Sequence, residues 1–277
     1  MVIITDRAQK SLAEAIARDS PNACAVMLYD GRLPRRLKKL RPCDLLVVLF
    51  SFDTYISGAN RFLSPFKKPK GLTAKYAFIR PGISGESLQQ GLSTPKELIY
   101  EKIAQFRQYE AGSKLRVTNA AGTDITLTIN SFTTCAYEIT EDGAMAFLPP
   151  SEVSAEVTQA DGKIAVDVTV GQLYYFGELL EQFGLTDEPV ILTVKNSMVA
   201  DIAGGAMAAR LKETLFALPP ECRALVELGH GLSDMQPTGL IGVDESIVHT
   251  CHFGIGDGGK CGLHLDVVIG GPSIEAL

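Results

Sequence analysis

The sequence predicts a mixed fold, with an α/β domain over residues 1–111 followed by an α+β domain with a candidate metal site over residues 112–277. Three observations support this prediction. The first part of the chain alternates short apolar runs with helical patterns, whereas the second part consists mainly of runs of alternating polarity. The chain of 277 residues is also long enough for two domains of roughly 100–200 residues each.

The expected strands of the first domain are short runs rich in branched or aromatic residues, bounded by Asp, Gly or Pro. The segments between them fit a 3.6-residue period better than a period of two, which is typical of helices. Strands that alternate with helices pack as parallel strands, so we expect a parallel, Rossmann-like sheet. The expected strands are residues 2–5, 24–29, 45–50 and 76–79, and the expected helices are residues 9–18, 33–40 and 55–63.

A helix start marks the end of this domain. Thr94 is a suitable cap, Pro95 suits the first turn, and Glu97 lies three places after the cap. We expect this helix to end before Gly112, and we place the domain boundary there.

The second domain is expected to contain paired strands and one amphipathic helix. Short turns at residues 121–123 and 196–197 separate runs of alternating polarity, as in hairpins. An amphipathic pattern follows and ends at two prolines. The expected strands are residues 114–118, 124–130, 164–170 and 190–202, and the expected helix is residues 206–218.

Composition excludes several classes of protein. Hydrophobic residues make up 46% of the chain and charged residues 21%, which predicts a packed core rather than disorder. The net charge of −6 argues against nucleic acid as a partner. The longest apolar run, residues 45–50, is far shorter than the roughly 20 residues that cross a membrane, and the first residues lack a signal-peptide pattern. Six cysteines are too few for a disulfide scaffold, so we expect a reduced, cytoplasmic protein without a membrane partner.

All four histidines lie in the last part of the chain. His264 and Asp266 are two positions apart in an apolar run, so both project from the same face of an expected strand. Burying an imidazole beside a carboxylate costs free energy unless both are paired, and a divalent metal would satisfy both. A buried hydrogen bond that only orients the core is the simpler alternative. His252, in a second apolar run, and the nearby Glu227 favour a metal.

The order of these motifs resembles the C-terminal half of the M29 metallo-aminopeptidases, the aminopeptidase T-like family. Its relatives include the iron(II) 2,5-dihydroxypyridine dioxygenases. The resemblance extends from about residue 112 to the end. It rests on residues 122–126, 147–153 and 223–231, on Thr238-Gly239-Leu240 and Asp244-Glu245, and on residues 252–256 and 264–266.

This resemblance implies five metal ligands and a hydrolase. A metal-activated water would attack a peptide or amide carbonyl, with one or two zinc, manganese or cobalt ions and with Glu152 and Glu227 as catalytic residues. It also implies a homodimer and a peptide or small amide substrate. The segment between His252 and His264 is short and lacks the tyrosine that the peptidases carry there. The implied ligands are Glu152, Glu227, His252, His264 and Asp266.

Two alternatives stay open. The first is a non-haem iron(II) ring-cleaving dioxygenase with a triad of His252, His264 and Asp266, because two histidines and one carboxylate suit iron(II). The second is an inactive peptide-binding or biosynthetic accessory protein on the same fold. We expect His230 to lie in a solvent-facing loop, and His249 to lie at a helix end or strand edge away from the site.

Overall fold

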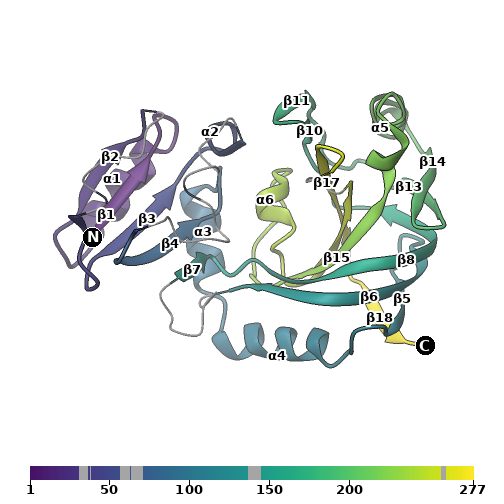
Figure 1. Ribbon diagram of the computed structural model, residues 1–277, viewed down its shortest axis with the longest axis horizontal. Helices are drawn as coiled ribbons and strands as arrows, with labels where there is room; N and C mark the ends of the chain where they lie inside the picture. The colour runs from purple at the N-terminus through teal and green to yellow at the C-terminus, as the bar shows by residue number, and fades with distance from the viewer. Residues whose placement is uncertain (31–36, 38, 57–62, 64–70, 137–144, 257–259) are drawn as a thin grey trace. The chain divides into compact units, whose positions relative to one another are not determined.

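The computed structural model describes residues 1–30, 37, 39–56, 63, 71–136, 145–256 and 260–277. The chain divides into two compact units, Met1–Ser93 with Cys135–Pro150, and Thr94–Thr134 with Ser151–Leu277 (Figure 1). These units differ from the expected ranges 1–111 and 112–277. Helix α4 (Lys96–Arg107) belongs to the second unit, where Phe106 packs edge-on against Phe132 at 6.0 Å.

The first unit contains a parallel sheet of five strands in the order β2-β1-β3-β4-β7. Its first four strands agree with the expected runs to within one or two residues, because these runs are apolar, and all except the second are mostly buried. The fifth strand was not expected, since the chain returns to this sheet only after entering the second unit. The strands are β1 (Val2–Thr5), β2 (Ala25–Leu28), β3 (Leu45–Leu49), β4 (Lys75–Ile79) and β7 (Met145–Leu148).

Three helices accompany this sheet in the described residues. Helix α1 (Lys10–Asp19) confirms the first expected helix, and α2 (Phe52–Ile56) overlaps only the start of the third. Residues 57–62 of that helix and most of the expected helix 33–40 lie outside the described residues. Helix α3 (Gly85–Leu92) was not expected, although Ser84 caps it by accepting a hydrogen bond from the Ser87 amide.

The second unit is built on one large sheet of antiparallel strands. The main path runs β11-β10-β17-β16-β15-β8-β6-β5-β18, and β9, β12, β13 and β14 join it from the side. The strands are β5 (Lys114–Thr118), β6 (Asp124–Cys135), β8 (Glu152–Val166), β9 (Thr169–Val170), β10 (Leu173–Tyr175), β11 (Glu178–Glu181), β12 (Gly184–Leu185), β13 (Val190–Lys195), β14 (Met198–Ala203), β15 (Leu225–Gly231), β16 (Thr250–Ile255), β17 (Leu263–Gly270) and β18 (Ser273–Ala276).

Most expected elements of this unit are present, so a mixed α/β fold is confirmed. Strands β13 and β14 turn at Asn196 and Ser197, and helix α5 (Ala206–Phe216) ends before the two prolines, as expected. The expected strand 164–170 is divided between the end of β8 and β9. The helix α6 (Ile241–Asp244) completes the elements that surround the candidate site.

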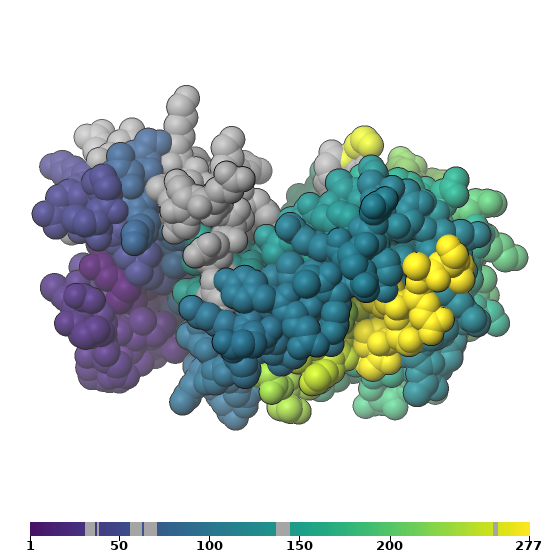
Figure 2. Space-filling model, turned by 90° about the horizontal axis from the view of Figure 1, so that it is seen from below, coloured from purple at the N-terminus to yellow at the C-terminus, as the bar shows by residue number. Residues whose placement is uncertain are grey.

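The C-terminal segment pairs with β5 and lies at the surface beside α4, as Figure 2 shows in yellow. The Tyr109 hydroxyl, just after α4, donates a hydrogen bond of 3.0 Å to the Ile274 carbonyl in β18. In the part of the chain that is described, no helix is long and apolar enough to span a bilayer.

Candidate metal site

Four neighbouring strands place the five candidate ligands on one face of the sheet. Glu227 in β15 lies opposite Gly254 in β16, and Gly254 lies opposite Asp266 in β17. Residues directly opposite each other in an antiparallel pair project from the same face, as do alternate residues along a strand. By the same register, His252 in β16, His264 in β17 and Glu152 in β8 share this face.

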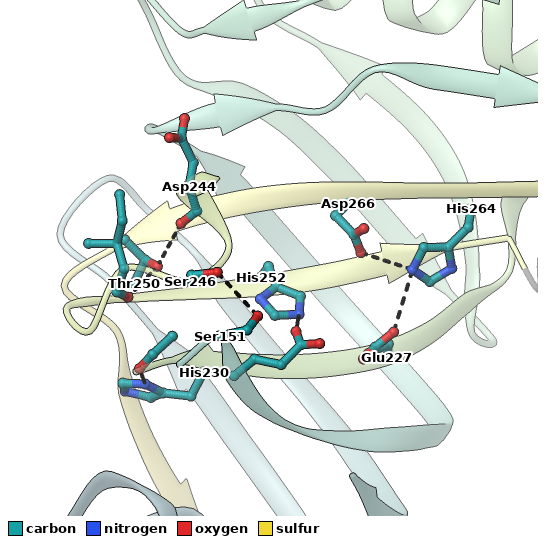
Figure 3. Close-up of polar contacts among 12 residues, drawn as sticks. Ser151, Glu227, His230, Asp244, Ser246, Thr250, His252, His264 and Asp266 are labelled. Carbon is teal, nitrogen blue, oxygen red and sulfur yellow. Dashed lines mark hydrogen bonds and ion pairs between the residues drawn. The ribbon is translucent and has the colours of Figure 1, made fainter. Parts of the chain in front are cut away.

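The five side chains form two overlapping groups. One ligand atom from each of Glu152, Glu227 and His252 lies within 4.8 Å of the other two, and the same holds for Glu227, His264 and Asp266. The Nε2 atom of His252 lies 2.9 Å from Oε2 of Glu152. The Nε2 atom of His264 lies 3.2 Å from Oδ1 of Asp266 and 3.5 Å from Oε2 of Glu227 (Figure 3). Glu227 therefore belongs to both groups.

The two groups differ in their access to solvent. The His252 side chain is 2% exposed and the Glu152 side chain 12% exposed, so the first group is shielded. The His264 side chain is 41% exposed, whereas its neighbour Asp266 is 12% exposed. A small molecule from solvent therefore reaches the second group first, at His264.

Two glycines make room for the imidazoles. A Cβ atom on Gly229 would lie 2.1 Å from both Cε1 and Nε2 of His252. A Cβ atom on Gly254 would lie 3.0 Å from Cε1 of His264 and 2.8 Å from Cβ of Glu227. Any larger residue at Gly229 would displace the His252 ring, because real Cβ contacts are longer than this. The sheet is thus hollowed where the rings lie.

The donor set and its spacing fit a divalent cation. Carboxylate oxygens and imidazole nitrogens are the donors of most catalytic iron, zinc and manganese sites. Two ligands at about 2.1 Å from an ion lie about 3.0 Å apart at a right angle and about 3.4 Å apart at a tetrahedral angle. The observed separations of 2.9, 3.2 and 3.5 Å span this range.

The carboxylates raise the pKa values of both histidines. Burial by itself would lower the pKa of His252, but its hydrogen bond to Glu152 and the charges of Glu152, Glu245 and Asp266 raise it to about 10. The charge of Asp266 raises the pKa of His264 well above its usual range, with Glu227 adding to the effect. Burial, together with the charge of Glu152, raises the pKa of Glu227. Without a cation, protons therefore neutralise part of the negative charge of this cluster.

The expectation for His230 is wrong. This residue lies in β15, not in a loop. It is three residues from Glu227, and strand residues an odd number of positions apart project from opposite faces. It lines a cavity of about 200 Å³ that also contains Lys102 and Tyr109. Its Nδ1 atom lies 2.8 Å from the Gly231 carbonyl and must donate to it, and burial lowers the pKa of the ring to about 4. His249 is exposed, directly before β16.

Glu152 lies in a strand and is largely buried, although two prolines come shortly before it in the sequence. It begins the long strand β8 and is only 9% exposed. It lies opposite Gly231 in β15, two residues from Gly229, against which the His252 ring lies.

Two further residues, Asp244 and Tyr174, have contacts or neighbours that their sequence positions did not predict. The fully buried Asp244 carboxylate accepts hydrogen bonds from the amides of Thr238 and Gly239 at 2.7 Å and from the Thr169 hydroxyl at 2.6 Å. It therefore ties the turn before α6 to β9. Tyr174 in β10 lies directly opposite His264, so a tyrosine stands beside the cluster although the segment 257–263 contains none. Residues 257–259 of that segment lie outside the described residues.

The comparisons with known proteins agree with each other. The family model described as NicX, 2,5-dihydroxypyridine 5,6-dioxygenase, matches residues 86–237. This range includes Glu152 and Glu227 and ends before His252, His264 and Asp266. The solved structure of 2,5-dihydroxypyridine dioxygenase from Pseudomonas putida KT2440 is similar in fold, with a TM-score of 0.61 at 16% identity over 99% of this chain and 87% of that chain. No curated protein matches the sequence.

These findings correct the functional expectation. The expected metallo-aminopeptidase-like hydrolase is wrong, because both the family model and the similar structure point to a dioxygenase. Neither comparison supports the link to M29 peptidases, although the related dioxygenases were named with them. Because the model matches residues 86–237, more than half of the 277 residues, the chain belongs to the 2,5-dihydroxypyridine 5,6-dioxygenase family.

Proposed function

We propose that this protein is a non-haem iron(II) dioxygenase that opens a hydroxylated pyridine ring. The observation that carries the proposal is the family match over residues 86–237. The cluster of imidazoles and carboxylates on one sheet face supports it, because such donors leave open positions on iron for substrate and oxygen. When bound, the iron supplies the one-electron chemistry that allows dioxygen to react with an aromatic ring.

The solvent-accessible group is the proposed iron site, with His264, Asp266 and Glu227 as its protein ligands. Their ligand atoms lie within 4.8 Å of one another, and His264 is the most exposed of the five side chains. Among the described residues, the alternative set of His252, His264 and Asp266 does not form a group within that distance. We therefore replace His252 with Glu227 in the triad.

His252 and Glu152 have a supporting role in this proposal. The nearby carboxylates keep a proton on His252 at neutral pH, so the ring donates to Glu152 and stabilises negative charge near Glu227. Because both side chains are shielded, they also keep water away from the inner side of the site. A second cation at Glu152, Glu227 and His252 would displace that proton, so the number of ions per chain is part of the test.

The test is anaerobic loading with one metal at a time. Metal-free protein is loaded with iron(II), zinc, manganese or cobalt, and then receives 2,5-dihydroxypyridine and ¹⁸O-labelled dioxygen. We expect oxygen uptake only with iron(II), and a ring-opened product that contains both labelled atoms. Oxygen uptake that is absent with iron(II), or equal with zinc, would refute the proposal. Substrate binding without oxygen uptake would instead support a binding protein that lacks turnover.

Three histidine variants test the ligand assignment. We expect His264→Ala to remain folded and to lose iron, because it removes a ligand from the accessible group. His249→Ala is the matched control, since that side chain is exposed and lies outside both groups. His252→Ala is expected to retain iron with lower affinity. Complete loss of iron in His252→Ala would return His252 to the triad in place of Glu227.

A further inference from the structure

A row of side chains leads from the candidate site to the edge of the sheet. Tyr174 in β10 lies directly opposite His264 in β17, and Leu179 in β11 lies directly opposite Tyr174. Directly opposed residues in antiparallel strands project from the same face with Cβ atoms about 4.5–5.5 Å apart. The phenol ring and the leucine side chain therefore stand on the face that carries the five candidate ligands.

The neighbouring aromatic residue in the same strand faces the other way. Tyr175 lies opposite Leu263, one residue out of step with His264, so it projects from the opposite face. Its ring packs edge-on against Phe176 at 4.7 Å. The chain thus offers two adjacent tyrosines of which only Tyr174 stands beside His264.

A large apolar side chain is exposed at this edge, because Leu179 is 45% exposed. It stands next to Tyr174, which lies opposite His264, the most accessible residue of the cluster. This location favours the ligand of that site as the partner of the exposed Leu179 side chain.

We propose that Tyr174 and Leu179 form the wall of the site that holds the substrate ring. The inference rests on the proposed function for the class of substrate, a planar hydroxylated nitrogen heterocycle. The five candidate ligands offer only polar contacts, so an aromatic ring needs an apolar surface from elsewhere. Leu179 supplies such a surface, and Tyr174 supplies a ring face for stacking and a hydroxyl for a polar substituent.

Binding is measured on the oxygen-free, iron(II)-loaded chain by calorimetric titration with 2,5-dihydroxypyridine. We expect Tyr174→Ala to weaken binding about tenfold, and Leu179→Ala and Tyr174→Phe about threefold each, because they remove part of the contact. In turnover, KM is expected to rise by the same factors while kcat changes less than about twofold. The control Tyr175→Ala is expected to bind as the parent does. Iron content should be equal in all variants, since none replaces a candidate ligand.

The outcomes separate this inference from the proposed function. If the parent binds no hydroxypyridine, the proposed function fails. If the parent binds and Tyr174→Ala and Leu179→Ala bind as tightly as Tyr175→Ala, the wall assignment is wrong and the proposed function stands. A change of oligomeric state in Leu179→Ala, with unchanged binding, would instead assign this apolar edge to contacts between copies of the chain.

Discussion

Each face of strand β15 has a histidine ring against it, and the surroundings shift the pKa values of these two rings in opposite directions. On one face, the His252 imidazole of the adjacent strand lies over Gly229, and its pKa is raised to about 10. On the other face, His230 lines a cavity with Lys102, and its pKa is lowered to about 4. Both rings are largely removed from water. The difference lies in the groups around them.

Burial alone disfavours the charged form of any imidazole, so it lowers the pKa of both histidines. Only the carboxylates of Glu152, Glu245 and Asp266 reverse this effect at His252. His230 has a backbone carbonyl and a lysine as neighbours, which leaves it neutral. A buried histidine is therefore a candidate ligand because of its partners, and burial by itself carries no such information.

Within this comparison of the two faces, the largest expected effect comes from filling the space under His252. Gly229→Ala would place a Cβ atom 2.1 Å from the ring, so the imidazole would have to leave the group it forms with Glu152 and Glu227. We expect metal affinity to fall by about 100-fold, measured as metal retained after dialysis. Gly85→Ala is the control, because its new methyl would meet only the end of the Leu12 side chain at 3.3 Å. Equal retention in both variants would contradict the arrangement of His252.

Two glutamates that lie opposite each other test whether metal affinity depends on the position of a carboxylate or only on its charge. Glu227 belongs to both candidate groups, whereas Glu156, directly opposite in β8, accepts hydrogen bonds of 3.2 Å from Asn130 and Ser131. We expect Glu227→Gln to lower metal affinity by about 10- to 100-fold, because a carboxylate shared by both groups is lost. Glu156→Gln should change it less than about twofold. Similar losses in the two variants would mean that only the net charge of this face matters.

Proton release measures the raised pKa values directly. In the metal-free protein His252 and His264 hold protons at pH 7, so each cation that binds an imidazole must displace one. Metal affinity is therefore expected to rise as pH increases above about 6.5. The raised pKa values also stabilise the metal-free fold below about pH 6.5, and this contribution is lost as pH rises through the folded values. Calorimetry in buffers with different ionisation enthalpies checks the release, and heats that do not depend on the buffer would contradict it.

The smallest expected effect belongs to the opposite face. Because the pKa of His230 is about 4 in the folded protein, the unfolded chain takes up this proton first as pH falls. The fold should lose about 1–2 kcal/mol between pH 7 and pH 5, and His230→Gln should remove this loss. Urea unfolding at the two pH values measures the difference. The exposed His249 provides the control variant His249→Gln, which should keep the loss seen in the parent.

Local sequence patterns were sufficient for elements with a regular apolar pattern. The first four parallel strands and the amphipathic helix α5 have continuous or periodic apolar residues, and they lie where expected. Strand β7 was missed because its pairing with β4 joins segments that are far apart in the chain. The short strands β10 and β11 were missed because each has too few residues to show a period.

For the site, the family resemblance nominated Glu152, Glu227, His252, His264 and Asp266, because its motifs can be compared with this sequence position by position. The same motifs led to the wrong prediction of a hydrolase, because they do not distinguish a hydrolase from a dioxygenase. Three features depend on which strands pair and in which register. His230 projects from the face opposite to Glu227, Tyr174 lies beside His264, and Glu227 belongs to both groups. Register is a non-local property, since one residue of slip moves every side chain to the other face. The sequence by itself therefore determined the residue types and the local periods. Which charged side chains meet on one face, and so what the site can bind, was decided only by the pairing of the strands.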